Sequence, residues 1–267
     1  MSWVRARRAA IGLLGFAALY LLASEIGQSR LPDRIWMGAH YVENVKLLPT
    51  WRALVEEGTF LIQSNILVDS IAVSTRRVVL GLLLGSVVGI LLGLLTGAAS
   101  RLEALADPWV TFFRFTPALA LLPLYVIWFG YGESSKVLLI ATNVAVVTFL
   151  GAHQGVRGVR RVYLDAASAL GADRWLTFRK VILPAAFPSI LASFRVATGL
   201  AWVTIVVAEL INAQMPSLGY LLALAGAYPR VPNMMIGLAT IGALVLVFDL
   251  LALLLNAWAT RWMERAA

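Results

Sequence analysis

Few side chains in this sequence could carry out chemistry, and their spacing argues against an enzyme. The two histidines, His40 and His153, lie far apart, and neither belongs to a His-Glu-x-x-His pattern that would hold a catalytic metal. None of the three lysines follows a glycine, so the chain lacks the Gly-Lys-Ser/Thr phosphate cradle of ATP-hydrolysing proteins. Cysteine is absent, which excludes disulfides and thiol chemistry. We therefore expect no catalytic residue, no bound metal and no cofactor in this chain.

The composition indicates that the chain is surrounded by lipid. Of its 267 residues 60% are hydrophobic and 13% are charged, and the mean hydropathy is +0.83. A soluble core cannot bury that much apolar surface. The net charge of +8 would suggest a nucleic-acid partner in a soluble domain, but the basic residues here lie between apolar spans, as the positive-inside rule describes. We expect a polytopic membrane protein that contacts membrane lipid and no nucleic acid.

One long polar break between two apolar spans, residues 163–184, has an unusual composition for a loop, YLDAASALGADRWLTFRKVILP. It predicts two short helices joined by a hinge. Asp165 is expected in the first turn of the first helix, where a carboxylate meets the positive end of the peptide dipoles, and small residues follow it. Gly171 stands where a left-handed residue closes a helix, and Asp173 can cap the second helix. Pro184 is expected in the first turn of the next apolar helix.

The small side chains of the first helix would let another surface approach closely, as a docking surface requires. An ordinary surface loop between two helices is the alternative. The order Asp-Ala-Ala, three residues, Gly, nine residues, Val-x-Leu-Pro resembles the coupling-loop signature of importer permeases in the ATP-binding cassette (ABC) class. Asp165 stands in place of the usual Glu and Val181 in place of Ile. The positions that match the pattern unchanged are Ala166, Ala167, Gly171, Leu183 and Pro184.

In that family the loop inserts into a groove of a separate ATPase subunit on the cytoplasmic side. The resemblance implies two ATP-binding subunits that carry ATP and Mg, a second permease copy forming a homodimer, and an extracytoplasmic solute-binding protein. The residues that it implies for contact with the ATPase subunit are Tyr163, Asp165, Ala166, Ala167, Gly171, Trp175, Phe178 and Pro184.

The rest of the chain predicts six apolar spans, and hence an all-α polytopic membrane protein with a cytoplasmic coupling-helix loop. With the resemblance, this is the type I ABC importer permease fold. The spans are expected near residues 9–26, 78–98, 114–133, 137–153, 183–210 and 234–258, with a polar return at 101–107. Cleavage of the first span as a signal peptide is an alternative. The tract at residues 208–220 also resembles this family, which implies a short helix that folds back at the outer face.

The spans suggest two parts and one orientation. Residues 1–69 would form an N-terminal transmembrane helix and an extracytoplasmic or interfacial segment, with an amphipathic helix near 50–58. Residues 70–267 would form the five-helix permease core with the coupling loop at 163–184. Arginines precede the first span, crowd the loop and follow the last span, so both termini and the loop are expected in the cytoplasm. The resemblance implies that the chain lies in the inner membrane of a bacterium.

Residues 114–133 support the resemblance independently. Pro117 and Pro123 interrupt helical hydrogen bonding at membrane depth, which is tolerated where the backbone lines protein or water. A kinked structural helix is the alternative. The segment is similar to the nitrate, sulfonate and taurine branch of the importer permeases, which implies a small organic or inorganic oxyanion as the solute. The matching residues are Arg114, Pro117, Ala120, Pro123, Leu124, Trp128, Phe129, Gly130, Gly132 and Glu133.

The second span carries glycines spaced four residues apart, so that all lie on one helical stripe. The absence of side chains there predicts close packing of backbones, within the chain or between protomers. The stripe consists of Gly81, Gly85, Gly89, Gly93 and Gly97.

Polar residues within the apolar spans are candidates for the solute pathway. Arg195 and Glu209 are costly in a bilayer and usually face a cavity, a partner or the interface, although a structural ion pair or snorkelling to the headgroups would explain them too. The expected pathway residues are Thr116, Asn143, Thr198, Thr204 and Glu209. A membrane-embedded enzyme and an ion-coupled secondary transporter remain alternatives. The latter would carry inverted repeats, and the sequence shows no convincing pair of matching halves.

Overall fold

The computed structural model describes residues 34–37, 40–43, 49–211, 214–227 and 230–264. Nearly all of this part of the chain is helical, which confirms the predicted fold class. The α-helices are α2 (Trp51–Gln63), α3 (Ile66–Ala98), α4 (Ser100–Phe115), α5 (Leu122–Phe129), α6 (Glu133–Arg157), α7 (Arg161–Ala169), α8 (Arg174–Thr177), α9 (Leu183–Ile211), α10 (Leu218–Ala227) and α11 (Val231–Glu264). The short turns are the 3₁₀-helix η1 (Ala118–Leu121) and the π-helix η2 (Phe178–Ile182). One addition is an antiparallel pair of strands, β1 (Arg34–Met37) and β2 (His40–Glu43).

Four helical runs in the described residues are long and apolar enough to cross a membrane. They are Ile66–Ala98, Glu133–Arg157, Arg174–Ile211 and Val231–Thr260. A fifth crossing arises if Arg101–Phe115 and Ala118–Phe129, which meet at 96°, count as one broken span. The expected first span, 9–26, lies outside the described residues. The count of six therefore stays a prediction.

The third span differs from its predicted position at residues 114–133. It begins at Ser100 and includes the segment expected as a polar return, because Glu103 pairs with His153 and Arg157 of α6. Helix α4 then ends at Phe115, since a residue before proline avoids helical dihedral angles and Thr116 is extended (ψ 121°). The chain turns at Pro117, and α5 restarts with its proline in the first turn, where no backbone N–H is needed.

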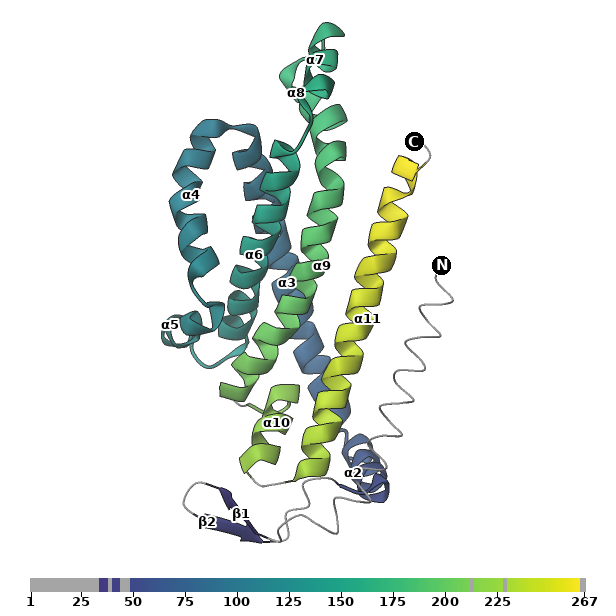
Figure 1. Ribbon diagram of the computed structural model, residues 1–267. Coiled ribbons are helices and arrows are strands. Elements are labelled where there is room, and N and C mark those ends of the chain that lie inside the picture. The colour runs from purple at the N-terminus through teal and green to yellow at the C-terminus, as the bar shows by residue number, and fades with distance from the viewer. Residues whose placement is uncertain (1–33, 38–39, 44–48, 212–213, 228–229, 265–267) are drawn as a thin grey trace.

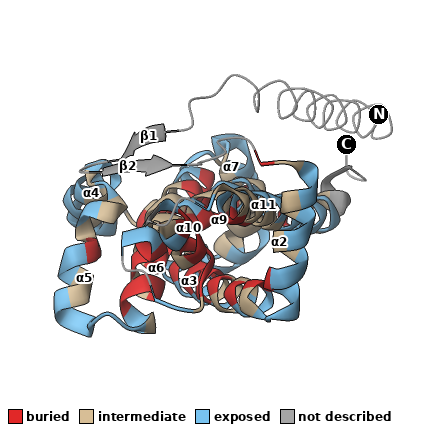
Figure 2. Cartoon of the chain, turned by 90° about the horizontal axis from the view of Figure 1, so that it is seen from below, coloured by how far each residue is buried: buried red, intermediate tan, exposed pale blue. Residues whose placement is uncertain are grey.

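The long helices α3, α6 and α9 form the centre of the bundle (Figure 1). Helices α4 and α5 flank it on one side and α11 on the other, while α7 and α8 lie at one end and α10 at the opposite end. Buried residues gather on α3, α6 and α9, whereas α4 and α5 are mostly exposed (Figure 2). The central core includes Trp202 and Ile205 of α9, packed with Ile140 and Val144 of α6.

The predicted glycine stripe of α3 faces α6 of the same chain. A Cβ atom added at Gly81 would lie 2.6 Å from Cβ of Ile140, and one at Gly97 would lie 2.7 Å from Cβ of Val156. At Gly89 an added Cβ would overlap the carbonyl oxygen of Ala145. Only backbone without side chains can approach this closely, so the glycines allow the two helices to pack along most of α3.

The short fold-back helix expected near residues 208–220 occurs slightly later in the chain, as α10 (Leu218–Ala227). Helix α10 packs against the end of α9, and a Cβ added at Gly219 would meet the backbone carbonyl carbon of Glu209 at 2.9 Å. Helix α2 includes the predicted amphipathic helix near 50–58, and the hydroxyl of Thr50 caps it by accepting from the N–H of Ala53 at 3.2 Å.

We expect Gly89→Ala to destabilise the protein although alanine is the better helix former. The added methyl group forces α3 away from α6, and such overpacking costs about 1–3 kcal/mol. The matched control is Gly242→Ala in α11, where an added Cβ would have no atom within 4 Å. Thermal unfolding of both purified variants in detergent should show a lower Tm for Gly89→Ala alone. Equal Tm values would contradict the close contact.

Candidate functional site

The predicted coupling loop forms the end of the bundle that carries α7 and α8. The sequence predicts Asp165 in the first turn of α7. The helix begins at Arg161, however, so Asp165 lies in its second turn. Gly171 closes α7 with a positive φ of 76°, as predicted. The N–H of Ala172 then donates to the carbonyl of Ala167 at 3.0 Å, which satisfies a carbonyl group at the helix end.

Asp173 caps α8 as predicted, because its carboxylate accepts from the N–H of Leu176 at 2.7 Å. Pro184 is the second residue of α9 and so lies in its first turn, as predicted, but α9 is not a separate helix. Helix α8, η2 and α9 are continuous from Arg174 to Ile211. Proline cannot donate to a carbonyl one turn earlier, and the π-helical turn Phe178–Ile182 directly before it changes the hydrogen-bond register there.

The loop exposes large apolar side chains. Leu170 is 88% exposed, and Trp175 is 68% exposed and stacks on Phe178 with ring centroids 6.2 Å apart. Two hollows flank α8: one takes in Tyr163, Ala166, Ala167 and Pro184, and the other Trp175 and Phe178. The structure thus brings six of the eight predicted contact residues to these hollows; Asp165 and Gly171 line neither. An exposed apolar surface of this kind is typical of a protein interface.

A buried cluster of charges lies at the opposite end of the bundle. Arg77 of α3 is 3% exposed and Glu209 of α9 is fully buried, and Nη1 of Arg77 lies 2.7 Å from Oε1 of Glu209. The same guanidinium binds Glu133, the first residue of α6, with Nε 3.0 Å from Oε2. The carboxylate of Glu209 also accepts from Oγ of Ser74 at 2.9 Å and from the N–H of Gly219 at 3.0 Å.

This cluster joins α3, α6, α9 and the start of α10 through one guanidinium and two carboxylates. Glu209, a predicted pathway residue, has its charge balanced inside the protein, and its role in the pathway stays a prediction. Sequence reasoning missed Arg77. It directly precedes the span expected at 78–98, where an arginine suggests a headgroup contact, and only its distant partners identify it as a buried residue.

The other pathway candidates do not converge on one place. Asn143 of α6 donates to Oγ1 of Thr204 on α9 at 2.7 Å, so these two lie together. The hydroxyl of Thr198 donates to the carbonyl of Phe194 within α9, and Thr116 lies apart at the break after α4. Their pathway roles remain predictions.

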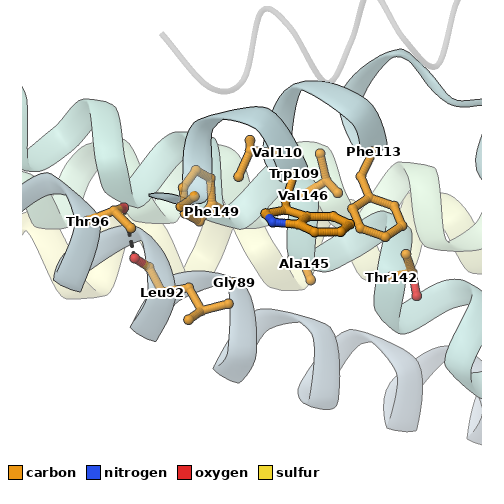
Figure 3. A pocket seen from close by; sticks show the side chains of 11 residues that line it. Gly89, Leu92, Thr96, Trp109, Val110, Phe113, Thr142, Ala145, Val146 and Phe149 are labelled. Atoms are coloured by element: carbon orange, nitrogen blue, oxygen red, sulfur yellow. Dashed lines mark hydrogen bonds between the residues drawn. The ribbon is translucent and has the colours of Figure 1, made fainter. Parts of the chain in front are cut away.

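An apolar cavity of about 370 Å³ lies between α3, α4 and α6. Figure 3 shows Trp109, Val110 and Phe113 from α4 together with Leu92 from α3 and Phe149 from α6.

One of the two histidines lies next to this cavity. His153 bonds through Nδ1 to Oγ1 of Thr96, which lines the cavity, at 3.1 Å. In the described residues no three His, Asp or Glu side chains gather as a metal site.

Comparison with known proteins decides the family. Residues 85–265 match the family described as "Binding-protein-dependent transport system inner membrane component". The chain belongs to this family. It is 36% identical over 244 residues to a probable ABC transporter permease protein of Brucella abortus, covering 90% of this chain and 97% of the relative. It is also 36% identical over 192 residues to the taurine transport system permease protein TauC of Escherichia coli, covering 72% and 70%.

The fold is similar to a solved structure of the MetNI methionine ABC transporter in an inward-facing conformation. The TM-score is 0.66 at 18% identity, with 73% of this chain and 97% of the other covered. Family membership confirms that the chain is a membrane-embedded permease subunit of an ABC transporter and that ATP hydrolysis belongs to a separate subunit. It selects this function over the ion-coupled carrier and the membrane enzyme.

The buried cluster provides a test with a control at the neighbouring residue. Arg77→Ala leaves Glu209 buried without its cation, which costs about 3–5 kcal/mol. Arg76→Ala removes the contact between Arg76 and Glu133. The Arg76 side chain is 61% exposed, so we expect the free energy of unfolding to fall by less than about 1 kcal/mol. Thermal unfolding in detergent should show a large drop in Tm for Arg77→Ala only. Similar drops in Tm for the two variants would mean that the buried Arg77–Glu209 pair stabilises the protein no more than the exposed Arg76–Glu133 contact does.

Proposed function

We propose that the chain forms the translocation pathway of a bacterial importer for a small oxyanion, such as a sulfonate, taurine or nitrate. It acts as a homodimer, with two ATP-binding subunits holding ATP and Mg on the cytoplasmic side and a solute-binding protein outside. The observation that carries the proposal is the exposed apolar loop with the coupling-loop spacing. The name of the taurine permease relative supports the substrate class.

The orientation follows from charge. The loop region is the densest basic part of the chain, with Arg157, Arg160, Arg161, Arg174, Arg179 and Lys180. Basic residues favour the cytoplasmic side. We therefore assign the loop and both termini to the cytoplasm, the α10 end to the outer side and the protein to the inner membrane. The division at residue 69/70 into an N-terminal segment and a permease core belongs to the same proposal.

The continuity of α8 with α9 suggests how motion would cross the membrane. The helical run Arg174–Ile211 begins in the loop and ends beside Glu209, a length of about 57 Å at 1.5 Å per residue. A displacement of α8 by the ATPase subunit would move α9 as a rod. At its outer end α9 is bound to α3 and α6 through Arg77, so the same displacement would bear on the outer ends of three helices.

Removing the exposed indole of Trp175 should weaken binding of the ATPase subunit. Co-expression with the ATP-binding subunit and purification through a tag on this chain measures the association. We expect Trp175→Ala to recover at most about one tenth of the ATPase obtained with the unchanged chain, since truncating an aromatic anchor often costs more than 1 kcal/mol. Trp258→Ala is the control, because Trp258 is 69% exposed but lies on α11. Equal recovery with both variants would refute docking at the loop.

The shape of the hinge provides an independent test. Gly171 has no atom within 4 Å of an added Cβ, so Gly171→Leu acts through its positive φ, which costs a leucine about 1–2 kcal/mol. We expect Gly171→Leu to retain ATP hydrolysis and lose solute uptake, with the protein still in the membrane. Gly171→Asn is the matched control, since asparagine tolerates this conformation. Radiolabelled taurine uptake and phosphate release in proteoliposomes measure the two activities; unchanged uptake in Gly171→Leu would contradict the assignment.

A further inference from the structure

A second ion pair, outside the cluster at the outer end, joins α9 to α11. Nε of Arg195 lies 2.6 Å from Oδ1 of Asp249, and Nη2 lies 2.8 Å from Oδ2, so the guanidinium and the carboxylate meet side by side. Neither residue belongs to the coupling loop. The pair therefore links two membrane-crossing helices away from both the loop and the buried cluster.

The pair lies deep in the membrane. Along α9, Arg195 is about 18 Å from Leu183 and about 24 Å from Ile211. Along α11, Asp249 is about 27 Å from Val231 and about 22 Å from Glu264. Both residues therefore lie near the middle of helices that are long enough to cross the hydrocarbon layer.

At this depth the pair is nevertheless exposed on the single chain. The side chains of Arg195 and Asp249 are 42% and 40% exposed, in contrast to 3% and 0% for Arg77 and Glu209. Charged groups at the bilayer centre face a water-filled cavity, a partner or each other, and not lipid tails. The two side chains cover only part of each other. We therefore expect polar surroundings at the part of the pair that stays exposed.

The residues next to the pair on α9 and α11 differ in how far they are packed. Toward the outer end, Trp202 of α9 contacts Phe248 of α11 edge to face, with ring centroids 5.4 Å apart, within the main core. On the cytoplasmic side of the pair, Ala192 of α9 and Leu253 of α11 are exposed. The pair thus lies next to the Trp202–Phe248 contact and has exposed residues on its cytoplasmic side.

The guanidinium keeps hydrogen-bond capacity for a ligand. Arg195 uses Nε and Nη2 for Asp249, and its Nη1 makes no hydrogen bond within the described part of the chain. A guanidinium fork matches the oxygens of a sulfonate or carboxylate group. Asp249 offsets the positive charge, which keeps binding weak enough for a passing ion to leave, as conduction requires.

We infer that the Arg195–Asp249 pair lines the solute path near the middle of the membrane and contacts the oxyanion group as it passes. The inference rests on the proposed function and names a contact within it. Arg195 supplies the attraction for the anion, and Asp249 limits its strength. A dry contact with a second copy of the chain, or with lipid, would leave the pair inaccessible to water and to anions.

Because the chain contains no cysteine, a single introduced thiol can report on this place without knowledge of the natural solute. Ala192→Cys lies one helical turn from Arg195 at an exposed position of α9. Val87→Cys is the control, since Val87 is 57% exposed on α3 beside other exposed apolar residues and should face lipid. Both are prepared in the complex with the ATPase subunit. The thiols are then treated with a methanethiosulfonate reagent carrying either a sulfonate or a trimethylammonium group, and the labelled permease is measured by mass.

We expect Ala192→Cys to react with the water-soluble reagents and Val87→Cys not to react. In the Ala192→Cys background the ratio of the sulfonate rate to the trimethylammonium rate should fall about tenfold with Arg195→Gln and rise about tenfold with Asp249→Asn, as local charge alters ion concentration. Excess methanesulfonate should slow labelling when Arg195 is present. The double variant Arg195→Gln/Asp249→Asn should show no preference, and it guards against misfolding caused by one unpaired charge.

Two results would overturn the inference. One is no reaction of Ala192→Cys in a complex that still takes up solute, which would indicate that this position is dry or covered by lipid. The other is a rate ratio that Arg195→Gln and Asp249→Asn leave unchanged, which would mean that the pair does not face the path. In either case ATPase recovery and uptake would remain normal. If the proposed function itself were wrong, the ATPase subunit would not co-purify even with the chain of unchanged sequence.

Discussion

The structure depends on the close approach of α3 and α6. Along this contact side chains and backbone atoms of α6 lie directly against the α3 backbone, because glycine recurs every fourth residue of α3. In a bilayer no hydrophobic force distinguishes a helix neighbour from lipid, so van der Waals contact of this quality is what holds two helices together. Helix α9 packs on the same pair through Trp202 and Ile205, and the other elements surround these three helices.

The ends of this bundle have opposite chemical character. The loop end exposes apolar side chains such as Leu170 and Trp175 where the chain meets water. At the α10 end the buried Arg77 lies between the buried Glu209 and Glu133, whose side chain is 44% exposed. An exposed apolar end suits binding to another subunit, whereas a buried ionic cluster keeps several helices in a fixed register. One continuous helical run, Arg174–Ile211, connects the two ends.

The polar groups inside the membrane fall into two kinds. Asn143 and Thr204 satisfy each other between α6 and α9, and Arg77 is surrounded by acceptors, so these groups have their partners within the single chain. Arg195 and Asp249 also pair, but they remain open on one side at mid-membrane depth. The difference between the two kinds lies in exposure, which the hydropathy of the spans does not reveal.

The sequence by itself determined the membrane environment, the helical class, the glycine stripe and the chemistry of the loop. These features depend on composition and on residues within one or two helical turns of each other. Gly171, which needs a positive φ, and the capping residue Asp173 act on neighbouring backbone groups, so their roles were predictable. The start of α4 was not, because the residues that pair with Glu103 lie on α6, far along the chain. Only the tertiary structure decided that Arg77 and Glu209, 132 positions apart, form one buried pair and that the glycines face α6. The physical reason is that such contacts depend on how helices rotate and which faces meet, and neither is encoded in any single span.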